Sequence, residues 1–323
     1  MRRIKWGILG AADIARSCMI PAMKTAPNCQ LFAIASRSFE KAEALRVSEG
    51  FEKAYGSYWE LLTDKEIEAV YIPLPNSLHK EWVIKAAEQG KHILCEKPLA
   101  GSEKDVIEMV AACEKSGVIL MEAFPYLHSP LIESVKENIN AGLIGKPAFI
   151  ETTFLTCGYP DENITVLREM LGGSVYDVGC YNISLLLTLL GEEPALVNAY
   201  AHFSHMNTDD FASAYFEFPS GCKASMISGM CSSQRADRFF IYGTKGTIEV
   251  MLPYNVFGSV EYTIQNQEKT EVIKIDVPNN YKLEIEQMGR CIIYGESPQV
   301  SSAFSVMQAR TMDRVLSSIG YIK

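Results

Sequence analysis

The sequence has no apolar run long enough to cross a membrane. Its longest apolar stretches, such as Leu185–Leu190, fall far short of the roughly 18 residues that span a bilayer. Asp13 interrupts the apolar run behind the basic N-terminal residues, so we interpret that run as a first strand and not as a signal peptide. Positive charge is not in excess either, because 39 Asp and Glu outnumber 30 Lys and Arg. The resulting net negative charge of -9 repels nucleic acid and anionic membrane surfaces, and we expect neither as a partner.

The nine cysteines form no recognisable framework. No two of them have a Cys-x-x-Cys spacing and their number is odd, which argues against both a disulfide scaffold and a zinc knuckle. His202 and His205 lie in an expected strand, where a separation of three places them on opposite faces. We therefore expect no metal, and a reducing, cytoplasmic location.

The length of 323 residues suggests about two domains. The first 122 residues alternate short β-rich runs, such as Ile4–Leu9, with amphipathic helical patterns, such as Ile14–Lys24 and Phe39–Glu49, which is typical of an α/β domain with a parallel sheet. From residue 123 onward, long alternating segments such as Pro147–Thr156 predict a large, mainly antiparallel sheet with a few helices, an α+β domain. The predicted domains are therefore 1–122 and 123–323.

The first predicted strand is followed by a turn of small residues. Dinucleotide-binding turns need small residues at three positions, for a tight turn, for the approach of pyrophosphate and for helix–strand packing. Here the three positions hold Gly10, Ala12 and Ala15, so only the first is glycine. Phosphate binding by the segment that contains Gly10, Ala12, Asp13 and Ile14 is one interpretation, and a plain strand-to-helix turn is the other.

The second strand ends without an acidic residue, at Ala35, Ser36 and Arg37. A carboxylate at this place would bind the ribose 2′-hydroxyl of NAD, whereas a hydroxyl followed by a guanidinium suits the 2′-phosphate of NADP. Lys41 could add a second positive charge or could be a solvated surface lysine. The pattern favours NADP, with NAD as the alternative.

Two further segments follow predicted strands, at the carboxyl edge where open α/β sheets bind ligands. The first contains Pro75, Asn76 and His79, and the second contains Glu96 and Lys97. We expect all five residues to border the cofactor. A lysine in such a place can orient a reacting hydroxyl and favour its deprotonation; the alternative is an ion pair of Lys97 with Glu96 on a loop.

The run from Val70 to Phe124, with its Pro-x-Pro-Asn-Ser-x-His, Glu-Lys-Pro and Met-Glu-Ala-Phe elements, resembles the Gfo/Idh/MocA oxidoreductase family. The segments 172–181 and 242–246 resemble later signatures of the same family, so the resemblance covers essentially the whole chain. It implies an N-terminal Rossmann dinucleotide-binding domain and a C-terminal domain that binds the substrate. It also implies an open sheet that commonly forms a subunit interface, hence a homodimer or homotetramer.

The resemblance implies roles for three residues. Lys97 matches the catalytic lysine of the Glu-Lys-Pro motif, Asp177 matches a motif aspartate, and Tyr181 matches the proton-transferring position. Many relatives carry an arginine shortly after Met-Glu-Ala-Phe, but this chain has Leu127 in that region. The departure leaves the identity of the substrate open.

These features together predict hydride transfer between a nicotinamide and a hydroxyl- or carbonyl-bearing carbon of a sugar, polyol or related cyclic alcohol. One alternative is an NAD-linked, inositol-type dehydrogenase. The other is a non-catalytic regulatory protein that binds NADP.

Overall fold

The computed structural model describes residues 2–322, which form two compact units. The first unit contains residues 2–127 and also Asn279–Val306, while the second contains His128–Pro278 and residues 307–322. The chain thus leaves the first unit after Leu127, returns to it at Asn279, and ends in the second. This differs from the division 1–122 and 123–323, which has no return, because a returning helix carries no local signal of the sheet it will cover.

The first unit is built on a six-stranded parallel sheet with the order β3-β2-β1-β4-β5-β6. The strands are β1 (Ile4–Leu9), β2 (Cys29–Ala35), β3 (Lys53–Tyr55), β4 (Ala69–Ile72), β5 (His92–Glu96) and β6 (Leu120–Ala123). The central strands are nearly continuous in apolar residues because both faces are covered, and Trp6 and Tyr71 are fully buried. Strand order reverses between β1 and β4, the place where such sheets bind ligands.

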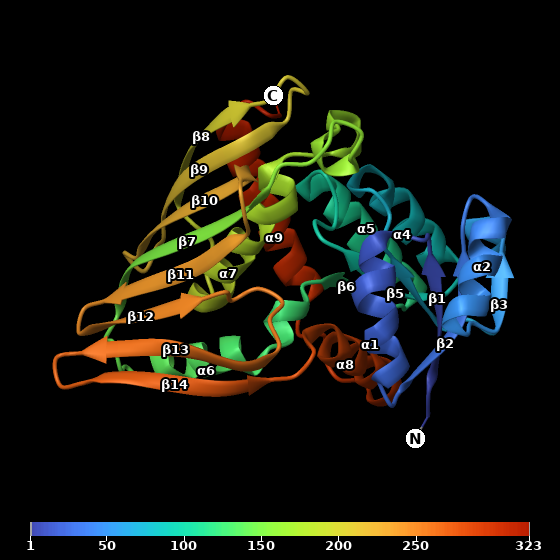
Figure 1. The fold of residues 1–323 in the computed structure, drawn as a ribbon, viewed down its shortest axis with the longest axis horizontal. Coiled ribbons are helices and arrows are strands. Elements are labelled where there is room, and N and C mark those ends of the chain that lie inside the picture. The colour runs from blue at the N-terminus through green and yellow to red at the C-terminus, as the bar shows by residue number, and fades with distance from the viewer. Residues whose placement is uncertain (1, 323) are drawn as a thin grey trace. The chain divides into compact units, whose positions relative to one another are not determined.

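Helices of the first unit begin and end at recognisable residues. They are α1 (Ile20–Thr25), α2 (Phe39–Glu49), α3 (Tyr58–Thr63), α4 (His79–Glu88), α5 (Glu103–Ser116) and α8 (Asn280–Tyr294). Ser102 caps α5 by accepting a hydrogen bond from the backbone of Asp105, and Gly117 ends it in the left-handed conformation. The returning helix α8 packs beside α1 and against β2 (Figure 1).

The second unit is built on an eight-stranded sheet with the order β14-β13-β12-β11-β7-β10-β9-β8. All neighbours are antiparallel except β7 and β10. The strands are β7 (Pro147–Cys157), β8 (Leu196–Phe203), β9 (Asp209–Glu217), β10 (Lys223–Ser232), β11 (Ala236–Gly243), β12 (Gly246–Met251), β13 (Gly258–Asn266) and β14 (Thr270–Val277). The predicted fold class, a parallel α/β part followed by a mainly antiparallel α+β part, is confirmed.

Helices cover one face of this sheet, with α6 (Pro130–Asn140) against β14 and α7 (Cys180–Leu190) against β7 and β10 (Figure 1). The last helix, α9 (Ser302–Ser318), begins in the first unit and continues into the second. A single helical stretch among the described residues, Arg168–Leu190, is long and apolar enough to span a membrane by composition. Its most apolar window is 78% buried, as expected of a helix in a protein core.

Candidate active site

Gly10 closes β1 with a backbone that only glycine adopts readily. Its φ is +115°, and its N–H donates to the carbonyl of Ala35 on β2 at 2.9 Å. A Cβ on Gly10 would lie 3.2 Å from Cδ2 of Leu74, in the loop after β4. The helix that follows begins at Asp13, and its turn Ala15–Met19 is π-helical. A helix start directly behind a positive-φ glycine fits a phosphate group.

Arg37 and the Gly10 turn lie close to the same tyrosine. Arg37 is exposed and lies near Tyr58, where burial raises the pKa of the tyrosine hydroxyl and the Arg37 guanidinium partly opposes that shift. The Tyr58 hydroxyl lies 3.7 Å from the position that a Cβ of Gly10 would occupy. Ser36 is buried, and its Oγ accepts a hydrogen bond from the backbone of Ser38 at 3.3 Å. The structure therefore brings the predicted phosphate turn and the predicted 2′-phosphate ligand to one edge of the sheet.

Lys41 and Asp13, like Arg37, are exposed members of the predicted set. Lys41 is exposed in the first turn of α2, where its backbone N–H donates to Oγ of Ser38 at 3.4 Å. The Asp13 side chain is 97% exposed and lies 3.5 Å from the guanidinium of Arg16.

His79 joins the two loops that follow β4 and β5. Its ring is fully buried, with Nε2 2.8 Å from the carbonyl of Leu74 and Nδ1 3.0 Å from the carbonyl of Pro98. Burial lowers the pKa of His79. Pro75 and Asn76, in the first of these loops, are half-buried. The structure thus places His79 between the loops, where it fixes their spacing.

One half-buried acid, Glu96, and one buried acid, Glu122, lie near the backbone of Lys97. Tyr71 donates a hydrogen bond to Oε1 of Glu96 at 2.5 Å, and the N–H of Leu99 donates to Oε1 of Glu122 at 2.9 Å. Burial raises the pKa of Glu122 to about 7, and the positive charge of Lys97 partly opposes that shift. Sequence reasoning assigned no role to Tyr71 or Glu122. The available signal was a charged residue inside a buried, otherwise apolar strand.

Asp177 and Tyr181 both belong to the second unit, in one continuous helical segment. A π-helical turn, Val175–Gly179, contains Asp177 and runs directly into α7, which contains Tyr181. Residues four apart in a helix lie on the same side. The structure thus brings Asp177 and Tyr181 together, while Lys97 lies in the first unit.

Asp209 anchors the start of this helical segment. Its Oδ2 accepts hydrogen bonds from Oγ of Ser174 at 2.7 Å and from the N–H of Val175 at 2.8 Å. Asp209 is fully buried, and burial raises its pKa to about 6. A carboxylate at this helix start satisfies a backbone donor, as an N-cap does. The sequence analysis did not identify this residue, which lies 32 positions after Asp177.

Tyr181 packs in an aromatic cluster with its hydroxyl at the edge. Its ring centroid lies 5.3 Å from that of Phe154 and 5.2 Å from that of Tyr254, and these two rings stack on each other at 4.9 Å. The hydroxyl of Tyr181 lies 3.3 Å from Nδ2 of Asn255. The guanidinium of Arg235 covers the Phe154 ring. This packing fixes the ring of Tyr181.

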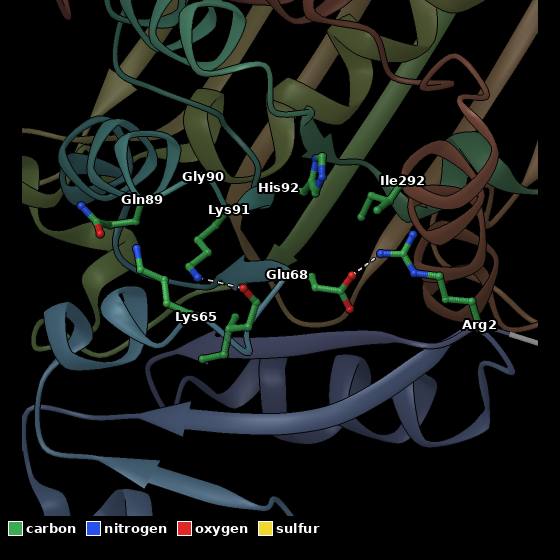
Figure 2. A pocket seen from close by; sticks show the side chains of 9 residues that line it. Arg2, Lys65, Glu68, Gln89, Gly90, Lys91, His92 and Ile292 are labelled. Atoms are coloured by element: carbon green, nitrogen blue, oxygen red, sulfur yellow. Dashed lines mark hydrogen bonds and ion pairs between the residues drawn. The ribbon is translucent and has the colours of Figure 1, made fainter.

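The pocket in Figure 2 lies at the opposite edge of the first sheet, where strands β4 and β5 begin. It encloses about 340 Å³ and is lined by Arg2, Lys65, Ile67, Glu68, Gln89, Gly90, Lys91, His92 and Ile292. Lys91 donates to the carbonyls of Asp64 and Ile67 at 2.6 and 2.8 Å, and Arg2 pairs with Glu68. Several polar side chains of this pocket are paired with other protein groups, and the pocket lies away from the carboxyl ends of the strands. It is therefore not the predicted cofactor site. Within residues 2–322 no cluster of His, Cys, Asp or Glu is suited to hold a metal ion.

A Rossmann unit with a glycine turn at its switch point, together with a separate unit that presents an acid and a tyrosine, defines a two-domain dinucleotide-dependent oxidoreductase. Comparison with known proteins assigns the family. Residues 4–124 match the model of the oxidoreductase family with an NAD-binding Rossmann fold, and residues 132–249 match the GFO/IDH/MocA C-terminal domain. The chain belongs to the Gfo/Idh/MocA oxidoreductases, which confirms the predicted family and enzyme class.

Two curated relatives extend over nearly the whole chain. The chain is 34% identical over 317 residues to D-xylose 1-dehydrogenase (NADP(+)) 2 of Haloferax volcanii, an alignment that covers 97% of this chain and 96% of that one. It is 31% identical to trans-1,2-dihydrobenzene-1,2-diol dehydrogenase of Xenopus tropicalis, with 98% of each chain covered. Among solved structures, it resembles a 3-ketoreductase of Actinomadura kijaniata in complex with NADP and TDP-benzene, with a TM-score of 0.93, 27% identity and 98% of each chain covered.

Proposed function

We propose that this protein is an NADP-dependent oxidoreductase that oxidises a hydroxyl, or reduces the corresponding carbonyl, on a sugar or a related cyclic alcohol. The observation that carries the proposal is the end of β2, where Arg37 lies near Tyr58 beside the Gly10 turn and no carboxylate is present. A guanidinium there compensates a 2′-phosphate that an acid would repel. The same cofactor is supported by two relatives. The D-xylose dehydrogenase is named as NADP(+)-linked, and the 3-ketoreductase is described in complex with NADP.

The chain's own residues supply binding and proton transfer. NADP, when bound, supplies or accepts the hydride at its nicotinamide ring. The Gly10 turn and Arg37 would hold its phosphates. In the oxidation direction the carbinol C–H bond breaks as a hydride, while the hydroxyl proton passes to the oxygen of Tyr181 as general base. We assign to Lys97 the positive charge that favours deprotonation of the substrate hydroxyl, and to Asp177 the orientation of a substrate hydroxyl.

The relatives favour neither of the two alternatives, an NAD-linked, inositol-type dehydrogenase and a non-catalytic regulatory protein. A regulatory protein without turnover would have no chemical need for Lys97, Asp177 and Tyr181 together. An NAD-linked dehydrogenase would need a ribose-binding acid where Ser36 and Arg37 stand. The proposal therefore stays with an NADP-linked enzyme.

The test is a panel of initial rates, followed by the absorbance of the reduced nicotinamide. D-xylose, D-glucose, myo-inositol and trans-1,2-dihydrobenzene-1,2-diol are each offered with NADP and with NAD. We expect turnover of an aldose or of the diol with NADP, at a kcat/KM at least tenfold above that with NAD. Turnover of myo-inositol with NAD alone would favour the first alternative, and no turnover with any pair would favour the second.

We also propose that the protein is a homodimer or homotetramer that associates through the face of the eight-stranded sheet opposite α6 and α7. Outward-pointing aromatic side chains support this. Phe149, Phe240 and Tyr242 lie together across β7 and β11, with ring centroids 6.0 and 6.4 Å from that of Tyr242, and Tyr242 is 40% exposed. Exposed apolar patches of this kind commonly mark interfaces. Light scattering of wild type and of Tyr242→Glu measures the mass directly, and a monomeric wild type would contradict the proposal.

The cysteines support a cytoplasmic location. All nine are free thiols, and Cys157 and Cys231 are exposed on the neighbouring strands β7 and β10. Exposed thiols on adjacent strands would be prone to oxidation in an oxidising compartment. Fractionation of the source cells tests the location.

A further inference from the structure

Asn255 is a polar residue beside Tyr181 to which neither the sequence motifs nor the family resemblance assigns a role. It lies in the connection between β12 and β13, and its Nδ2 donates to the hydroxyl oxygen of Tyr181 at 3.3 Å. We propose that Asn255 is a positioning residue for proton transfer, whose amide stabilises the Tyr181 oxygen in its deprotonated form. The inference rests on the proposed function, because it assumes that Tyr181 exchanges a proton with the substrate.

The backbone of this connection is built to present the amide. Asn255 has a φ of +54°, so a residue with a side chain occupies the left-handed region. Such conformations cost free energy and persist only where the surrounding structure enforces them, often at functional sites. Asn tolerates the left-handed region better than most residues with a side chain.

Tyr254, the preceding residue, shows what enforces the conformation. Its hydroxyl donates to Oδ1 of Asn182 at 3.0 Å, its N–H donates to Oδ2 of Asp237 at 3.3 Å, and its carbonyl accepts from Arg235 at 2.6 Å. Asn182 is the neighbour of Tyr181 on α7 and is itself held by the carbonyl of Ile227. The loop that carries Asn255 and the helix that carries Tyr181 are therefore fixed to each other on both sides of the contact.

The amide oxygen Oδ1 of Asn255 is buried and accepts no hydrogen bond from any group in residues 2–322. An amide held only through Nδ2 can turn about its Cβ–Cγ bond and present Oδ1 instead. Before the reaction, Nδ2–H stabilises the deprotonated oxygen of Tyr181. After that oxygen has taken the substrate proton, the amide turns and Oδ1 accepts a hydrogen bond from the new O–H group of Tyr181. An aspartate of the same shape has no N–H group, so it could only accept the hydrogen bond from the protonated tyrosine.

The test compares three variants of one loop. Asn255→Gly deletes the amide without straining the positive φ, and Asn255→Asp keeps the shape but removes the donor. Leu252→Gly is the matched control, because it changes the backbone at a second positive φ and removes a side chain that is 50% exposed. Loss of one donor to a developing oxyanion commonly costs about 100- to 1000-fold in kcat, and for this longer contact we expect about 10- to 100-fold.

The account predicts this loss in kcat for Asn255→Gly and Asn255→Asp, with KM and the Kd of NADPH within about threefold of wild type and a larger solvent deuterium isotope effect. Leu252→Gly should match wild type. A purely structural role would not raise the isotope effect. Turnover of Asn255→Asp within twofold of wild type, or equal losses in Asn255→Gly and Leu252→Gly, would overturn the proposal.

A readout without turnover separates this inference from the proposed function. In the protein without cofactor, the side-chain amide ¹H–¹⁵N signals of Asn255 should shift on Tyr181→Phe, and those of Asn207 should not. Unshifted Asn255 signals would overturn the inference even if the enzyme is active. A wild type without turnover would instead remove the proposed function.

Discussion

The backbone N–H of Leu99 donates to Oε1 of Glu122 at 2.9 Å, which ties the loop behind Lys97 to the neighbouring strand β6. The acceptor is a fully buried carboxyl group, and burial raises its pKa from 4.5 to about 7. The same residue thus positions the Lys97 loop and titrates near neutral pH.

We therefore expect Glu122 to make stability depend on pH. Between about pH 4.5 and 7 the folded protein keeps a proton that the unfolded chain has lost, so stability falls as pH rises through this window. At about 1.4 kcal/mol per unit, the loss between pH 5 and pH 8 is about 2–3 kcal/mol. Glu122→Gln keeps an acceptor for Leu99 but does not titrate. Urea unfolding at both pH values should show a smaller fall in the variant, and parallel curves would contradict the assignment.

Gly173 permits the close approach of the anchor Asp209. Its φ is +120°, and an added Cβ would lie 2.2 Å from Oδ1 of that buried carboxyl group. Gly173→Ala should therefore destabilise the protein by about 3 kcal/mol or more. Gly142→Ala is the control, since Gly142 also has a positive φ but open space around it, and should cost about 1–2 kcal/mol. Equal losses in urea unfolding would mean that the contact with Asp209 is unimportant.

Tyr181→Phe should abolish most turnover and leave the fold intact, because it removes only the hydroxyl to which we assign the proton exchange. Tyr254→Phe offers a matched comparison in the same aromatic cluster. Its hydroxyl bonds to Asn182, so its removal should cost about 1 kcal/mol of stability and, by loosening the loop that carries Asn255, should lower kcat far less than Tyr181→Phe does. The measurements are kcat and urea unfolding of both variants. Full activity in Tyr181→Phe would assign proton transfer to water or another residue.

Lys97→Met should lower kcat by about 100-fold or more and leave the Kd of NADPH within a few-fold, since it removes the charge that we propose acts on the reacting oxygen. Lys104→Met, on the exposed side of α5, controls for the loss of a lysine. Near wild-type turnover in Lys97→Met would remove this residue from the mechanism.

Local signals explain what the sequence could predict. The strand Ile4–Leu9 and the helix Phe39–Glu49 have the predicted bounds, because an apolar run and a capping residue mark them. The turn Ala15–Met19 is π-helical, where a uniform helix over Ile14–Lys24 was expected. A single widened turn depends on tertiary packing and has no local pattern.

The residues of the candidate site also differ in whether the sequence alone could identify them. Motif residues such as Lys97 and Tyr181 could be identified from the sequence because they resemble the family's signatures. Asp209 and Asn255 could not, since each acts across a long sequence separation through one side chain in a strand start or a turn. Their roles follow from hydrogen bonds that only the folded chain creates.

Cofactor choice is the most direct test of the account. NADPH and NADH are titrated by fluorescence against wild type, Arg37→Ala and the control Lys41→Ala. A charge-assisted hydrogen bond worth about 1.5–3 kcal/mol predicts that Arg37→Ala weakens NADPH by about 10- to 150-fold and NADH much less. Wild type should bind NADPH more tightly than NADH, and Ser36→Asp should reverse that order. A wild type that prefers NADH, or equal weakening of both dinucleotides by Arg37→Ala, would contradict the NADP assignment.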